Sequence, residues 1–186
     1  MTKIVIDGNI GAGKTTQITR LQELGNRVKK EPIHLWPLEL FYSDPQRWAY
    51  LFQMVILKSL TPDTESCIYE RCPLSSLKVF WEILEKHPEE DKAYRAYYND
   101  YGWSPDIYIY IATPPEVCKE RINSRVQDGD SGVSLDYLCT LDSKYMNMYM
   151  DLECKKFIVD GTQPEEIIHK NILNILNELQ VETLQE

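Results

Sequence analysis

The chain has 186 residues, 43% of them hydrophobic and 26% charged, a size and composition that suit one globular domain with a buried core. Its 20 Lys and Arg residues against 29 Asp and Glu residues give a net charge of −9, which disfavours a nucleic acid polymer or a membrane as a partner. The five cysteines include no CxxC pair, so neither a disulfide framework nor a zinc site is expected.

Strand and helix patterns alternate along the chain from Lys3 onward, which is typical of an α/β fold with a parallel sheet. We find no signal-peptide pattern before Lys3 and no apolar run long enough to span a membrane, so we expect a cytoplasmic protein. A single domain over residues 1–186, with three α/β/α layers around five parallel strands, is predicted. The predicted strands are residues 3–7, 27–30, 66–70, 106–112 and 156–160, and the predicted helices are 14–24, 45–60, 75–87, 90–101, 115–127, 134–152 and 163–179.

The most specific motif lies between the first predicted strand and the first predicted helix, where residues 8–15 match G-x-x-x-x-G-K-[ST]. In this pattern, backbone N–H groups of the loop and of the helix N-terminus converge on phosphate oxygens. Lys14 adds a positive charge toward the terminal phosphates, and the Thr15 hydroxyl can bind Mg²⁺. The motif predicts a P-loop NTPase-type fold and a nucleotide site formed by Gly8, Asn9, Ile10, Gly11, Ala12, Gly13, Lys14, Thr15 and Thr16.

Charged residues follow the second and third predicted strands, as Glu31-Pro32 and Glu70-Arg71. In proteins with this motif, the carboxyl ends of the parallel strands meet at the edge where the ligand binds. A carboxylate there can take a proton from an alcohol, and a carboxylate beside Mg²⁺ can hold the metal or its water. Each glutamate alone could be a solvated loop acid, but their joint placement favours a functional role.

A second glycine-rich stretch, residues 127–132, follows a predicted helix that carries Arg121 and Arg125. These arginines are four residues apart and would share one helix face. Arginines that lead into such a segment are typical of a lid that closes over the transferred phosphate and excludes water. We therefore predict a mobile lid over about residues 121–133, with an ordinary charged helix face as the alternative. No guanine-reading N-K-x-D motif is present, which disfavours a GTPase switch.

Together these motifs resemble those of the deoxyribonucleoside kinases. The segments that carry the resemblance are residues 8–16, Glu31-Pro32, residues 38–49 with Phe52-Gln53, Glu70-Arg71, and residues 115–117 with residues 120–122. The resemblance implies an enzyme that uses ATP and Mg²⁺ to phosphorylate the 5′-OH of a deoxynucleoside, and a homodimer, which is common in the family. Thymidylate kinases share the fold, but they typically carry an acidic residue early in the loop, where this chain has Asn9-Ile10, and an Asp-Arg pair in place of Glu70-Arg71.

The resemblance also implies roles for the polar residues. Glu31 would take the proton from the 5′-OH, Arg71 would steady that oxygen, and Glu70 would arrange Mg²⁺ together with Thr15. Lys14, Arg121 and Arg125 would stabilise the transferred phosphoryl group. Tyr42 would contact the 3′-OH, with Asp130 of the lid as its acidic partner. The base would lie between Trp36, Phe52 and Phe80 and pair with the amide of Gln53.

Family members that prefer cytidine or purines carry an Arg and Asp pair in the base pocket, where this chain has Leu60 and Ser76, with Ile56 nearby. The resemblance therefore implies a preference for thymidine and other pyrimidine deoxynucleosides. The chain departs from the family at Pro73, at Gln127, where a lid arginine is common, and at Asp130, which is shorter than the usual glutamate. A thymidylate kinase and a non-catalytic nucleotide-binding regulator are the alternative functions.

Overall fold

The computed structural model describes residues 1–125 and 132–183. Its centre is a five-stranded sheet of order β2-β3-β1-β4-β5, in which all neighbouring strands are parallel. This arrangement confirms the predicted fold, and each predicted strand is found within two residues of its expected ends. The strands are β1 (Lys3–Asp7), β2 (Val28–Lys29), β3 (Cys67–Glu70), β4 (Ile107–Ala112) and β5 (Lys155–Asp160).

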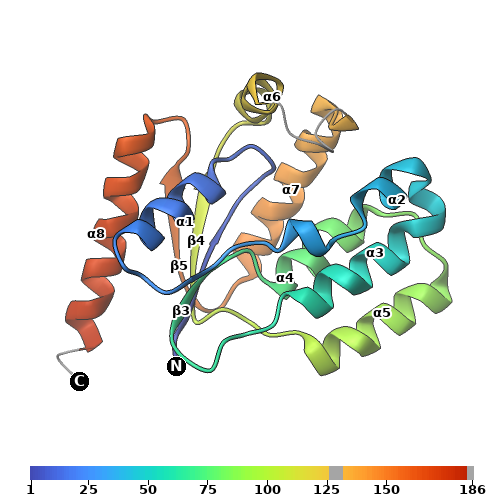
Figure 1. Ribbon diagram of the computed structural model, residues 1–186, viewed down its shortest axis with the longest axis horizontal. Coiled ribbons are helices and arrows are strands. Elements are labelled where there is room, and N and C mark those ends of the chain that lie inside the picture. Colours follow the sequence, from blue (N-terminus) through green and yellow to red (C-terminus); the bar gives the residue numbers. More distant parts are fainter. Residues whose placement is uncertain (126–131, 184–186) are drawn as a thin grey trace.

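Helices cover both faces of this sheet (Figure 1). The predicted start of one helix at Asp44-Pro45 is confirmed, because the Asp44 side chain accepts a hydrogen bond from the backbone N–H of Arg47 and Pro45 occupies the first helical position. The helices are α1 (Lys14–Glu23), α2 (Leu38–Ser43), α3 (Pro45–Ser59), α4 (Pro73–Ser75), α5 (Pro88–Tyr101), α6 (Pro115–Ser124), α7 (Leu135–Asp151) and α8 (Glu165–Thr183), with a 3₁₀-helix, η1 (Ile33–Leu35), and a π-helix, η2 (Ser76–Trp81).

The two faces of the sheet are buried in different cores because side chains alternate along each strand. Ile6 and Ile109 lie in a core of aliphatic side chains shared with α1 and α8. Val5, Tyr108 and Tyr110 face the opposite way and pack with tyrosines of α7. Figure 1 shows α1 and α8 on one side of the sheet and α7 on the other.

A helical layer on the α7 side extends beyond the sheet and consists of α3, α5 and η2 (Figure 1). Its core contains Leu57, Leu77, Trp81 and Tyr94, and the rings of Trp81 and Tyr94 stack with centroids 4.2 Å apart. This layer forms one wall of the cavity described below. No helix within the described ranges is long and apolar enough to cross a lipid bilayer.

Two predicted helices have different bounds in the structure, and one helix of the structure was not predicted. The predicted helix over residues 75–87 begins at Pro73, passes into the π-helical turns of η2 and ends before Lys86. The predicted helix over residues 115–127 ends at Ser124, and the extended backbone of Arg125 removes the shared helix face that was expected for the two arginines. The six-residue helix α2 was not predicted, because its length is too short for a clear apolar period.

Candidate active site

The phosphate loop connects β1 to α1, and its backbone has the left-handed conformations that the glycines permit. Gly11 has φ +82°, and a Cβ there would lie 2.7 Å from the carbonyl oxygen of Cys118. The Asn9 side chain fixes the loop to α7 by donating a hydrogen bond of 2.9 Å from Nδ2 to the Leu138 carbonyl. The ammonium of Lys14 donates to the Asn9 carbonyl over 2.8 Å and is almost fully buried. The loop therefore holds a desolvated positive charge at the N-terminus of α1.

Two glutamates lie at the carboxyl ends of β2 and β3, beside this loop. The Thr15 hydroxyl donates a hydrogen bond of 2.5 Å to Oε1 of Glu70. The backbone N–H of Glu31 lies 3.5 Å from Oε2 of the same carboxylate. The carboxylate of Glu31 forms an ion pair with Arg71, with 3.3 Å between Oε1 and Nε. The prediction that Glu31 and Glu70 lie together at one edge of the sheet is therefore confirmed.

Arg71 has a left-handed backbone, with φ +63°, directly after β3. A non-glycine residue in this region costs of order 1 kcal/mol or more, and such strain is often found at functional sites. Its backbone N–H donates to the Ile6 carbonyl, and its guanidinium carbon lies 4.6 Å from the centre of the Phe80 ring. The strained backbone therefore directs a buried guanidinium into the space between Glu31 and Phe80.

Asp7, the last residue of β1, is a charged neighbour of this site that the sequence interpretation missed. Its side chain is fully buried, accepts a 2.8 Å hydrogen bond from the Gly8 backbone and another from the Ser75 hydroxyl, and lies 3.7 Å from Nε of Arg71. The rule that identified Glu70 at a strand end also applies to Asp7.

Burial governs the charge states of this cluster. Desolvation raises the pKa of Glu31 to about 7, and the negative charges of Glu70 and Asp7 add to the rise, although Arg71 opposes it. Desolvation also lowers the pKa of Lys14 to about 8, with Arg71 contributing in the same direction. A carboxylate whose pKa lies near neutrality is suited to accept a proton at physiological pH.

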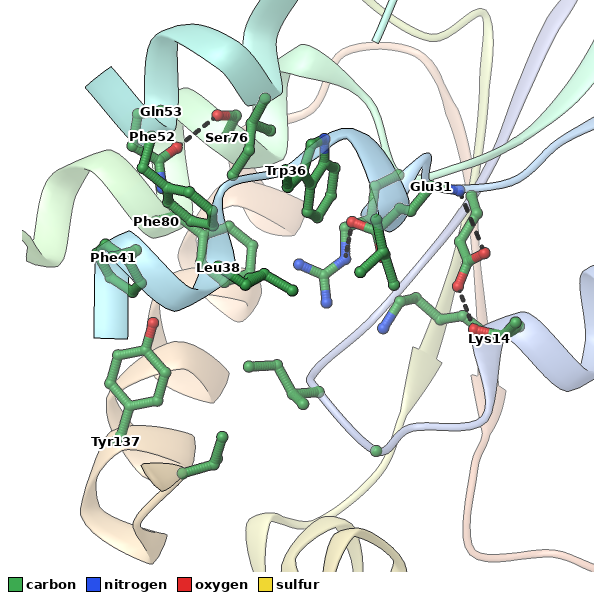
Figure 2. A pocket seen from close by; sticks show the side chains of 18 of the residues that line it. Lys14, Glu31, Trp36, Leu38, Phe41, Phe52, Gln53, Ser76, Phe80 and Tyr137 are labelled. Carbon is green, nitrogen blue, oxygen red and sulfur yellow. Dashed lines mark hydrogen bonds and ion pairs between the residues drawn. The ribbon is translucent and has the colours of Figure 1, made fainter. Parts of the chain in front are cut away.

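One cavity of about 530 Å³ extends from the phosphate loop into the helical layer. Figure 2 shows that Lys14 and Glu31 are at one end and the aromatic side chains at the other. Every predicted substrate residue in the described part of the chain lines it: Glu31, Trp36, Tyr42, Phe52, Gln53, Ile56, Leu60, Arg71, Ser76 and Phe80. So do the predicted nucleotide or metal residues Ile10, Gly11, Gly13, Lys14, Thr15, Thr16, Glu70 and Arg125.

The aromatic end of the cavity contains Phe41, Leu38 and Tyr137, which the sequence interpretation did not select. The ring of Phe41 stacks on Phe52 with centroids 4.4 Å apart, and Trp36 contacts Phe52 edge-on at 6.4 Å. Phe41 and Leu38 belong to the unpredicted helix α2, and their spacing of three residues was the available signal. Tyr137 comes from the first turn of α7, where no motif marks it (Figure 2).

Four predicted nucleotide residues do not line the cavity: Gly8, Asn9, Ala12 and Arg121. Arg121 instead connects two loops, because its guanidinium donates to the Ala12 carbonyl at 3.4 Å and to the Gly161 carbonyl at 2.8 Å. Asp130 and Gln127 lie outside the described residues, as does the whole of residues 126–131 of the predicted lid. The structure therefore leaves the predicted role of the lid untested.

Comparisons with known proteins agree with this geometry. A thymidine kinase of Ictalurid herpesvirus 1 is 30% identical over 90% of this chain and 82% of the relative. A deoxyadenosine kinase of Dictyostelium discoideum is 30% identical over 81% of this chain and 68% of the relative. The structure of deoxyadenosine kinase from M. mycoides with bound dCTP superimposes with a TM-score of 0.83 at 26% identity, covering 95% of this chain and all of that one.

The family model described as deoxynucleoside kinase matches residues 4–181. That range includes the phosphate loop, both glutamates, Arg71 and the aromatic end of the cavity. The chain belongs to the deoxynucleoside kinase family and is a phosphotransferase with an alcohol acceptor.

Proposed function

We propose that this kinase transfers a phosphoryl group from ATP to the 5′-OH of pyrimidine deoxynucleosides, with thymidine preferred. One observation supports it most. A single cavity joins the phosphate loop and the Glu31–Arg71 ion pair to an aromatic slot that ends at the amide of Gln53. A nucleoside in this cavity would present its sugar to the charged end and its base to the aromatic end.

The charged end would carry out the transfer. Glu31 would accept the proton of the 5′-OH, because its pKa of about 7 lets it be ionised yet basic near neutrality. Arg71 would hold that oxygen and stabilise the charge that develops on it, while Lys14 would contact the transferred phosphoryl oxygens. Arg125 lines the cavity at the edge of the predicted lid and would add positive charge there.

Thr15 and Glu70 fit a magnesium ion. Their side-chain oxygens lie 2.5 Å apart at the cavity wall, and hydroxyl and carboxylate oxygens are the hard ligands that Mg²⁺ prefers. Mg²⁺, when bound, neutralises negative charge on the phosphate oxygens. The hydrogen bond between the two side chains keeps both oxygens side by side, so one ion could bind both.

The base end supports the preference for pyrimidines. Around Gln53 the cavity is lined by Ile56, Leu60 and Ser76. None of these side chains is charged, so recognition of the base edge would depend on the donor and acceptor of the Gln53 amide. Relatives are named for different nucleosides, thymidine and deoxyadenosine among them, and the preference of this chain rests on these pocket residues.

The test is a measurement of ADP release with ATP and Mg²⁺ against the four deoxynucleosides and dTMP. We expect the highest kcat/KM with thymidine, a lower value with deoxycytidine and no turnover of dTMP. Highest activity on a purine deoxynucleoside would contradict the pyrimidine preference. Turnover of dTMP alone would show that the acceptor is a nucleotide.

A further inference from the structure

Three buried polar groups form a row behind the base end of the cavity. The Ser76 hydroxyl oxygen lies 2.8 Å from Oε1 of Gln53 and 2.8 Å from the hydroxyl of Tyr94. Gln53 and Ser76 line the cavity, whereas Tyr94 on α5 is completely buried and does not reach it. Figure 2 shows the contact between Gln53 and Ser76 at the far end from Lys14.

We infer that Tyr94 acts through Ser76 to fix which way round the Gln53 amide lies, and thereby helps to select the base. This inference rests on the proposed function, in which Gln53 meets the base edge. Tyr94 is then a positioning residue, since it touches neither the cavity nor a ligand within it.

The number of hydroxyl protons in this row determines which way round the Gln53 amide lies. Each hydroxyl has one proton to donate, and within the described part of the chain Ser76 is the hydrogen-bond partner of the Tyr94 hydroxyl. Burial raises the pKa of Tyr94 to about 12, so the phenol keeps its proton. The Ser76 oxygen is the acceptor that lies within reach of that proton. Ser76 therefore donates its own proton to Oε1 of Gln53. The NH₂ group of the amide is left for a ligand, together with the second lone pair of Oε1.

The opposite orientation of the amide has a definite cost. If the Gln53 NH₂ faced Ser76, the serine oxygen would accept from it, and the row of three groups would hold two hydroxyl protons with at most one acceptor between them. Either the phenol proton or the serine proton would then be buried without an acceptor in this row, which is unfavourable. Tyr94 is also held in place, because its ring stacks on Trp81, whose Nε1 donates to Asp91 over 2.8 Å. The row of hydroxyls thus resists a flip of the amide.

A fixed amide discriminates between two classes of base. Thymine and guanine present a ring N–H next to a carbonyl oxygen, whereas cytosine and adenine present a ring nitrogen next to an NH₂ group. An amide pairs with either edge only if its oxygen and NH₂ exchange places. The hydrogen-bonded row of Tyr94, Ser76 and Gln53 therefore favours one of these two classes of base, which the proposed function identifies as the class that contains thymine.

The experiment compares kcat/KM for thymidine and for deoxycytidine in the wild type, in Tyr94→Phe and in Tyr97→Phe. Phenylalanine at position 94 keeps the ring that stacks on Trp81 and removes only the hydroxyl. We expect the thymidine-to-deoxycytidine ratio to fall about 5- to 10-fold in Tyr94→Phe, the worth of one hydrogen bond. Tyr97→Phe removes a phenol hydroxyl from the same helix and should leave the ratio unchanged; the Tyr97 ring packs against Tyr101.

Ser76→Ala interrupts the same row from the cavity side and should lower the ratio in the same direction. Adding Tyr94→Phe to Ser76→Ala should then cause no further change, because the connection is already lost. The inference would be overturned if the thymidine-to-deoxycytidine ratio in Tyr94→Phe stayed within about 2-fold of wild type, because one hydrogen bond should change it by more. It would also be overturned if Tyr94→Phe and Tyr97→Phe changed the ratio equally. Absence of activity on both nucleosides in the wild type would instead contradict the proposed function.

Discussion

Oε1 of Glu31 and Nε of Arg71 are 3.3 Å apart in an ion pair whose two side chains are only 10% and 9% exposed. Such a pair usually lowers the pKa of the acid, yet the pKa of Glu31 is raised to about 7 because burial outweighs the nearby positive charge. The carboxylate is thus stabilised enough to ionise near neutrality and is still basic enough to remove a proton.

The pH dependence of kcat/KM should report this group. A base must be ionised to act, so we expect kcat/KM to rise with pH through about 7. It should fall again above about pH 8, where Lys14 loses the charge that contacts the phosphoryl oxygens. Glu31→Gln should lower kcat by about 10²- to 10⁴-fold and remove this rise. Steady-state kinetics between acid and alkaline pH, with circular dichroism to verify folding, is the measurement. Near wild-type activity in Glu31→Gln would rule out its role as the base.

Asp7→Asn should move that rise to lower pH. The negative charge of Asp7 contributes to the raised pKa of Glu31, so neutralising it makes Glu31 easier to ionise. The amide is nearly the same size and can still accept from the backbone N–H of Gly8, while its NH₂ group can donate to the Ser75 hydroxyl instead of accepting from it. Comparing the pH profiles of wild type and variant tests this. A midpoint that stays in place or moves to higher pH would contradict the electrostatic account.

Thr15→Val should weaken the response to magnesium. The variant is similar in shape but lacks the hydroxyl that lies 2.5 Å from Glu70, so we expect the Mg²⁺ concentration for half-maximal activity to rise about 10-fold. Thr19→Val, one turn further along α1, removes a hydroxyl that bonds only the Thr15 carbonyl among the described residues and is the matched control. Equal sensitivity to Mg²⁺ in both variants would argue against a metal site at Thr15.

Comparing Gly11→Ala with Gly25→Ala distinguishes the effect of backbone strain on stability from the effect of the loop shape on ATP binding. Both glycines have positive φ, +82° and +88°, so each substitution should cost about 1–2 kcal/mol of stability. A Cβ at Gly25 meets open space, whereas at Gly11 it would lie 2.7 Å from the Cys118 carbonyl and displace the loop. We expect thermal unfolding to detect both changes and calorimetry to detect weaker ATP binding only in Gly11→Ala. Unchanged ATP affinity in that variant would contradict the need for this loop shape.

The features that sequence predicted well are those that local residues determine. The phosphate loop is specified by glycines within one short segment, and Glu31 and Glu70 follow from the rule that parallel strands end at a common edge. Trp36, Phe52 and Phe80 were named from the family resemblance, and all three line the cavity. None of these predictions required the detailed contacts between particular side chains.

The features that sequence missed depend on contacts between distant residues. Helix α2 is too short to be stable alone, and its Phe41 packs on Phe52 of the next helix. The π-helical turns of η2 lie where Trp81 stacks on Tyr94, thirteen residues later in the chain. Asp7 acquires its importance only when Arg71 and Ser75 are brought beside it.

The π-helix also has a consequence for chain length. A π-helical turn contains one more residue than the α-helical turn that it replaces. Removing the exposed Lys78 would therefore convert η2 into α-helix, and the segments before and after it would keep the faces that they now bury. A one-residue deletion within α3 would instead rotate the part of α3 after the deletion relative to the part before it. Alignments with relatives should accordingly accept a one-residue gap between Ser76 and Trp81, and insertions or deletions elsewhere in the helical layer should be far less tolerated.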